Sequence, residues 1–300
     1  MKGILRVGIS LFLITLMSSC IRDGELLDNC FRLIRIQFQW IDTEPLSPSE
    51  QVNVAITPSN GTTQNITSNV TGRDVDLMPA TYTLVGYEQE ENVTINEIEG
   101  VVSVNTLSDG SLLEPTLFSA GKTTAEVVLR PDTLIIPIPM YQQTRPLIIE
   151  VLFRDTRIPI INEFPPVKEL SAVLHGVTLE RNINDGFVEE EREIPVARKR
   201  GDIPYNLQKS ELSRQDSLIY IDSHNLLGLD FSTHILDLHV EFENGLFENF
   251  SVDVTEQIAG FHSKEIHKPW YIIITLTLDS SLNVSIQDWI AGPDSWLTAM

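Results

Sequence analysis

The sequence has few cysteines and few basic residues. Only two of its 300 residues are cysteine, Cys20 and Cys30, which is too few for a disulfide framework or a four-thiolate zinc site. Lysine and arginine number 21 against 42 aspartates and glutamates, so the formal net charge is −21. Because the acidic residues are spread along the chain, nucleic-acid backbones and anionic lipid surfaces would repel it. The composition therefore argues against a nucleic-acid-binding protein.

The sequence also lacks the motifs of common catalytic and metal sites. It contains no Gly-x-Ser-x-Gly, no phosphate-binding glycine loop and no His-Glu-x-x-His. His234 and His239 are five residues apart, so on a strand they would point to opposite faces. Neighbouring acids such as Glu97 and Glu99 are expected in so acidic a chain. We therefore predict a protein that is not an enzyme and has no catalytic residues, no cofactor and no metal.

The N-terminal apolar run is too short to cross a bilayer. Residues 7–17 are largely apolar and follow Lys2 and Arg6, as in the hydrophobic region of a signal peptide. Two small residues then precede Cys20, which is typical of the bacterial lipobox, where cleavage leaves the cysteine as a lipidated N-terminus. We predict that residues 1–20 are a lipoprotein signal peptide and that Cys20 is lipidated. An ordinary secretory signal with an incidental cysteine is the alternative.

Helical periodicity is scarce, and alternation with a period of two takes its place. Residues 34–40 alternate apolar and polar side chains, which puts one hydrophobic face on a strand. The same alternation recurs in residues 52–56, 236–242, 272–278 and 284–286. Asn-Gly or Asp-Gly dipeptides, which favour hairpin turns, occur at 60–61, 109–110, 185–186 and 244–245. The pattern predicts an all-β protein.

Prolines separate two groups of predicted strands. Four of them, Pro131, Pro137, Pro139 and Pro146, lie within sixteen residues. Because proline cannot donate to a strand ladder, we expect this stretch to be a domain joint and not a central strand. The alternating segments on both sides predict two β-sandwich domains in series. The expected boundaries are residues 21–30 for a tether, 31–140 for the N-terminal domain and 141–300 for the C-terminal domain.

The end of the chain carries apolar side chains without a core of their own. Trp289, Ile290, Trp296 and Leu297 follow the last alternating strand, in a segment (288–300) that is too short to fold alone. We expect these side chains either to pack on the second domain or to contact a partner protein.

Several short motifs together resemble the fimbrillin-like and fimbrial anchor lipoproteins of Bacteroidetes, which build type V pili. The lipobox is followed by a strand that opens near residues 29–32 and ends at 38–40. Next comes Met78–Val85, in which Ala80 stands where that family usually has the glycine of Leu-Pro-x-Gly-x-Tyr. Two later segments are similar to the family's strands, and the second contains its Asp-Trp pair: Ala172–Val177 and Val284–Gly292.

This resemblance implies two transthyretin-like Greek-key β-sandwich domains and a non-enzymatic pilus subunit or anchor that acts in cell adhesion. Proteins of that kind are exported as surface-exposed outer-membrane lipoproteins and join other fimbrial subunits by strand addition. The resemblance also makes Arg73 a candidate cleavage point for an arginine-specific protease. An ordinary surface-loop arginine is the alternative there.

A second function, from another class, is a surface glycan-binding lipoprotein of a carbohydrate-uptake system. Such proteins bind sugars on exposed aromatic side chains. The chain has four tryptophans, and Trp40 and Trp270 fall in alternating strands, where we expect them to pack in the core. An exposed platform of two or three aromatic side chains would favour the glycan-binding function.

Overall fold

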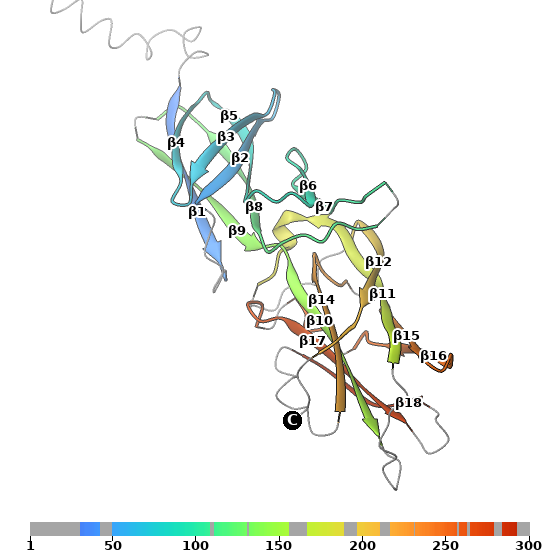
Figure 1. Ribbon diagram of the computed structural model, residues 1–300. Coiled ribbons are helices and arrows are strands. Elements are labelled where there is room, and N and C mark those ends of the chain that lie inside the picture. The colour runs from blue at the N-terminus through green and yellow to red at the C-terminus, as the bar shows by residue number, and fades with distance from the viewer. Residues whose placement is uncertain are drawn as a thin grey trace, which may run out of the picture.

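A computed structural model describes residues 31–42, 50–108, 111–130, 132–155, 167–188, 197–210, 217–230, 232–256, 258–262, 265–278 and 284–292. Within these ranges every regular element is a strand, apart from one three-residue 3-10 helix, Ile183–Asp185. No helix in the described part has the length and apolar character that a membrane crossing needs. The prediction of an all-β protein is confirmed, and Figure 1 shows the strands arranged as two regions placed end to end.

The N-terminal region is built on one seven-stranded sheet. Its neighbouring strands are antiparallel, except β1 and β9, which run parallel. Side chains at both ends of the strand order share one hydrophobic cluster, including Ile36 from β1 and Val54 from β2, so the sheet folds over on itself. The strand order is β3 (Gln64–Asn69), β2 (Gln51–Pro58), β5 (Ala80–Tyr87), β8 (Ser119–Val127), β9 (Leu134–Gln142), β1 (Arg32–Ile41) and β4 (Arg73–Leu77).

The proline-rich stretch is a central strand of this sheet, contrary to the prediction from sequence. β9 contains Pro137 and Pro139, and it lies between β8 and β1. β8 pairs with β9 only at Tyr141 and Gln142, beyond both prolines. The carbonyl oxygen of Pro139 faces Gly121 of β8, where an added Cβ would lie 1.8 Å from it. The backbone nitrogens of the two prolines, which carry no hydrogen, therefore face β8. Because β9 does not pair with β8 at these positions, no ladder hydrogen bond is lost and the sheet stays intact.

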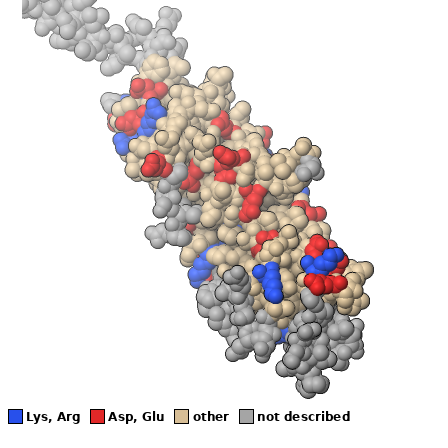
Figure 2. Space-filling model, viewed as in Figure 1, with Lys and Arg blue, Asp and Glu red and all other residues tan. Residues whose placement is uncertain are grey.

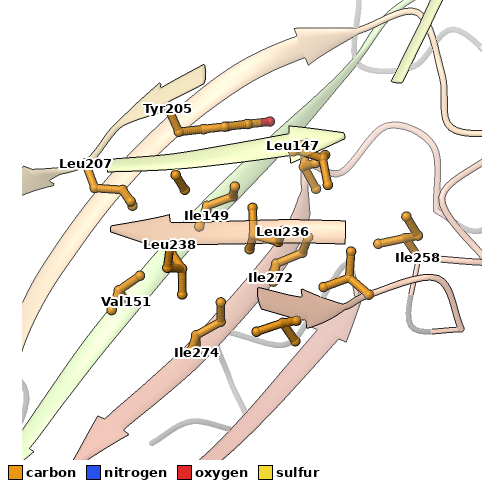
Figure 3. Packing of buried hydrophobic residues seen from close by; sticks show 14 of the residues in the cluster. Leu147, Ile149, Val151, Tyr205, Leu207, Leu236, Leu238, Ile258, Ile272 and Ile274 are labelled. Atoms are coloured by element: carbon orange, nitrogen blue, oxygen red, sulfur yellow. The ribbon is translucent and has the colours of Figure 1, made fainter. Parts of the chain in front are cut away.

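The C-terminal region consists of two sheets that face each other. In Figure 3, Leu147, Ile149 and Val151 of one sheet lie against Leu236 and Leu238 of the other, and all five side chains are buried. The first sheet has the order β13 (Gln208–Lys209), β14 (Ser217–Leu226), β10 (Arg145–Asp155), β17 (Trp270–Leu278) and β18 (Val284–Gly292). The second has the order β16 (Phe247–Asp253), β15 (Ile235–Phe242), β11 (Val167–Asn182), β7 (Val101–Val104) and β6 (Val93–Asn96), and β12 (Lys199–Asn206) also pairs with β11.

A hairpin from the first half of the chain extends the second sheet of the C-terminal region. The hairpin β6–β7 pairs with the end of β11, where Val102 lies opposite Arg181. A separate hydrophobic cluster joins Val102 to Val85 and Ala120 of the N-terminal sheet and to Leu227 of the C-terminal region. The two regions therefore share buried apolar surface, and the hairpin stabilises their contact.

Two of the predicted hairpin turns are confirmed. The Asn60-Gly61 dipeptide connects β2 with β3, and Asn244-Gly245 connects β15 with β16. Asp185-Gly186 is not a hairpin turn, because it ends the 3-10 helix after β11, where an added Cβ on Gly186 would meet Tyr141 and Gln143. The dipeptide at 109–110 lies outside the described residues.

Candidate functional site

Three of the predicted site residues lie outside the described residues: Cys20, Trp296 and Leu297. Trp289 and Ile290 lie in β18, whose backbone pairs Trp289 with Ile274 and Ile290 with Ile273. The expectation that both follow the last strand is therefore wrong, because β18 continues to Gly292. The cause is a bulge: Leu276 pairs with Ile286 but Thr275 pairs with Asp288, which leaves residue 287 over and breaks the period-two pattern.

β18 is the end strand of its sheet among the described strands. Its backbone pairs only with β17 among the described strands, so its other side presents N–H and C=O groups that no described strand uses. β18 has nine residues, while the other described strands that pair with one neighbour only, β3, β4, β6, β12, β13 and β16, have between two and eight. It also contains one charged residue, Asp288, whereas β4 contains three. Long, weakly charged edges pair readily with a further strand, which makes β18 the candidate assembly site.

Arg73 lies at the start of β4, where it pairs with Ile36 of β1. Its Nη1 donates to the carbonyl oxygen of Thr67 (2.7 Å). The preceding residue, Gly72, has φ +114°, and a Cβ there would lie 1.9 Å from the Ile36 carbonyl oxygen. Arg73 is thus an exposed side chain on a strand that follows a tight turn, and it does not stand in a free loop.

Two buried arginines hold the elements around the contact between the regions. Arg145, the first residue of β10, donates from Nε to the carbonyl oxygen of Lys268 (2.9 Å), from Nη2 to that of Glu265 (2.8 Å) and from Nη1 to that of Phe261. Its guanidinium also lies 5.0 Å from the ring centre of Trp270. Sequence reasoning missed Arg145, although it stands in phase with the inward-facing Leu147 and Ile149.

Arg181 performs the same function at the end of β11. It donates to the carbonyl oxygens of Leu227 and Gln143 (both 2.7 Å), so it links β11 to the segment that leaves β9. Burial lowers the pKa of Arg181 to about 10, and it remains a cation at neutral pH. Nearby His262 is stacked on Phe187 and accepts a hydrogen bond from the Leu229 N–H (3.0 Å). Burial, with the charges of Arg181 and Arg145, lowers the pKa of His262 to about 3.

Two partly exposed histidines contact carboxylates of neighbouring segments. His224 of β14 contacts Glu114 (3.1 Å), whose other oxygen accepts from the Asn225 N–H (2.9 Å). Burial opposes the charged imidazolium, but the hydrogen bond and charge of Glu114 outweigh it and raise the pKa of His224. His175 of β11 lies between Asp202 (3.1 Å) and Asp237 (3.0 Å). Within the described ranges no group of three or more His, Cys, Asp or Glu side chains could hold a metal ion.

The described surface offers no evident sugar platform. Trp40 is half-buried against the N-terminal cluster and Trp270 is buried, as predicted from their strands. Phe31, directly before β1, and Phe247, on β16, are the large exposed aromatic side chains of the described part, and they lie in different regions of the molecule. Figure 2 shows acidic side chains distributed over the visible face, with lysine and arginine in a few separate groups.

The structure defines an all-β protein of mostly antiparallel sheets, whose two regions meet through a shared apolar cluster and the hydrogen bonds of buried Arg181. A candidate adhesin from Bacteroides ovatus has the same fold, with a TM-score of 0.57 and 15% identity over 84% of this chain and 92% of that chain. The fimbrial anchor protein Mfa2 from Porphyromonas gingivalis gives a TM-score of 0.55 and 11% identity, over 88% and 98% of the two chains.

A candidate polysaccharide-binding protein from Bacteroides thetaiotaomicron is also similar, with a TM-score of 0.51 and 6% identity over 87% of this chain and 98% of that chain. No protein-family model and no curated protein matches the sequence. At these identities the solved structures establish the fold alone. They are consistent with the resemblance to fimbrillin-like proteins.

Proposed function

We propose that the protein is a non-enzymatic surface lipoprotein that acts in cell adhesion as a fimbrial subunit or fimbrial anchor. Its strands form two transthyretin-like Greek-key β-sandwich domains, residues 31–140 and 141–300, with β6–β7 as an arm from the first to the second. The fold shared with the candidate adhesin and with Mfa2 supports this proposal. The glycan-binding alternative has less support, because the described aromatic side chains form no exposed platform.

The position of β18 at the end of the described strand order is the observation that carries the proposal. An extended segment of another fimbrial subunit adds to this edge as a further strand, and main-chain hydrogen bonds supply the affinity. Such assembly needs a long unpaired backbone edge and no catalytic residue. Trp289 and Ile290 place large apolar residues in that strand, and the partner contact predicted for them belongs to the same edge.

Cys20 holds the protein at the outer membrane, with the folded regions exposed at the cell surface. Acyl chains on this cysteine contribute about 0.8 kcal/mol per buried CH₂, so more than one chain anchors the protein durably. Residues 21–30 are the tether between the lipid and β1. Other fimbrial subunits are the protein partners.

Two variants test the proposal. Cys20→Ala should release the protein from the membrane fraction, and removal of residues 288–300 should abolish co-purification with fimbrial subunits. Phe247→Lys, a charge on the exposed edge strand β16 of the other sheet, is the matched control and should retain the partners. Far-UV circular dichroism must show that each variant is folded. Membrane retention unchanged by Cys20→Ala would refute lipid anchoring, and co-purification unchanged by the truncation would refute assembly through β18.

A further inference from the structure

Five exposed apolar side chains gather at the end of the N-terminal region where β1 begins. Ten large hydrophobic side chains of the described part are exposed, and half of them lie here: Phe31 (62%), Leu33 (47%), Met78 (44%), Val128 (37%) and Ile135 (54%). We call this set the N-terminal apolar patch, because it lies at the end of the molecule where β1 begins. Figure 1 shows the start of β1 at the upper end of the molecule, far from β18.

Strand pairing brings side chains of the N-terminal apolar patch close together. β4 ends at Leu77, which pairs with Arg32, so Met78 lies opposite Phe31 across the two strand ends. β1 and β9 run parallel, with Arg35 beside Ile135, which places Ile135 diagonally across from Leu33 on the outer face. The side chain of Arg32 donates to the carbonyl oxygens of Val128 (2.9 Å) and Asp132 (3.1 Å), which holds the end of β8 against β1.

A groove of about 580 Å³ opens beside the N-terminal apolar patch and shares Met78 and Val128 with it. Apolar side chains line most of it, and the Tyr82 hydroxyl donates to the Met78 carbonyl oxygen (3.0 Å) and fixes that wall. The lining residues come from the turns at this end of the molecule: Pro58, Asn60, Gly61, Met78, Pro79, Ala80, Tyr82, Val128 and Leu129. Exposed apolar surface that is grouped and grooved in this way marks a contact site.

The position of Cys20 indicates what the N-terminal apolar patch contacts. Ten residues, 21–30, separate that cysteine from Phe31, and fully extended they span at most about 35 Å. A lipid on Cys20 therefore keeps this end of the molecule within a short distance of the bilayer. Charges of both signs stand among these side chains, because Asp76 pairs with Leu33 and Arg35 lies beside Ile135, while the chain as a whole is strongly acidic. This distribution suits a zwitterionic lipid surface better than an anionic one.

We propose that the N-terminal apolar patch docks on the lipid surface. The N-terminal end of the molecule then contacts the membrane, and β18 is directed away from it. The inference rests on the lipid anchoring at Cys20 that is part of the proposed function. The tether raises the local concentration of lipid around the patch, which makes a modest apolar contact sufficient. The docked end then fixes the direction in which the assembly edge points.

Hydroxyl-radical footprinting tests this docking within one molecule. The mature chain from Cys20 onward, with Cys30→Ser, is coupled through its Cys20 thiol to a maleimide phospholipid in phosphatidylcholine vesicles. The same protein with the thiol blocked is mixed with identical vesicles as the reference. Tethering should remove most of the oxidation at Phe31 and Met78 and leave Phe247, which is equally exposed at 61%, unchanged. Equal oxidation of Phe31 and Met78 in both samples would overturn the proposal.

A pair of variants separates lipid docking from other causes of protection. Leu33→Glu with Ile135→Glu should restore oxidation of Met78 in the tethered protein, whereas Leu246→Glu, at a side chain of similar exposure (51%), should not. Protection that depends on protein concentration and occurs without vesicles would instead identify a second copy as the occupant and refute docking on lipid. Because the tether is imposed chemically, these results do not depend on native acylation, which mass spectrometry of the N-terminal peptide decides separately.

Discussion

Replacement of Arg145 by methionine should destabilise the C-terminal region strongly. The substitution keeps a long apolar stem but leaves the carbonyl oxygens of Phe261, Glu265 and Lys268 without their donor. One of these bonds is buried and the other two are partly buried, so water replaces part of what is lost. Leaving a buried acceptor without a partner costs about 1–3 kcal/mol, so the total should be about 3 kcal/mol. Loss of the cation above the Trp270 ring acts in the same direction.

Urea denaturation, followed by tryptophan fluorescence and by far-UV circular dichroism, measures this change in the free energy of unfolding. Arg35→Met is the matched control, because Arg35 pairs with Asp74 (3.3 Å) where both side chains are half exposed. Exposed pairs of this kind contribute at most about 1 kcal/mol. If Arg145→Met destabilised the protein no more than Arg35→Met does, the buried arginine would not hold the segment after β16 in place, and the reasoning would be wrong.

Two further predictions concern single contacts. In the folded protein the pKa of His224 is raised and that of Glu114 is lowered. The pair therefore stabilises the fold most between the ordinary pKa values of the two groups, about 4.3 and 6.5. The stabilisation is lost as the pH rises through the pKa of folded His224, or as it falls through that of folded Glu114. The stability difference between the natural protein and His224→Gln should therefore be larger at pH 5.5 than at pH 9, and an equal difference in urea titrations would contradict it. Gly121→Ala should cost about 3 kcal/mol, because the added Cβ would lie 1.8 Å from the Pro139 carbonyl oxygen. A thermal unfolding midpoint unchanged by that substitution would show that β8 and β9 do not approach as described.

The sequence predicted the strands that obey a simple alternation, because one buried face leaves a period of two. Ile34 and Ile36 are buried where the pattern put them, and β15 follows the same rule, whereas β10 and β17 also bury Leu152 and Ile273 on their other face. The proline rule failed for β9, since it assumes that both sides of a strand carry a ladder. The β6–β7 hairpin could not be foreseen, because its pairing with β11 joins residues almost eighty positions apart, and local patterns contain no register information.

The candidate site was predicted only in part, for two physical reasons. The bulge opposite Thr275 shifts the alternation, so the sequence pattern predicts an end at Ile286, and the full length of β18 does not follow from it. Arg145 was passed over because charged residues are expected at the surface, although its phase on β10 points into the core. An arginine in phase with buried positions is the signal that would have found it.

The most direct test of assembly through β18 is hydrogen–deuterium exchange of its backbone amides, measured in the purified protein and again in assembled fimbriae. An edge strand has every second N–H directed away from its sheet, so these amides exchange rapidly until another strand pairs with them. The account predicts that assembly protects about half of the β18 amides and leaves those of β16 unchanged. Exchange in β18 that assembly leaves unchanged would contradict the account, whether the new protection then appears in β16 or in none of the described edge strands.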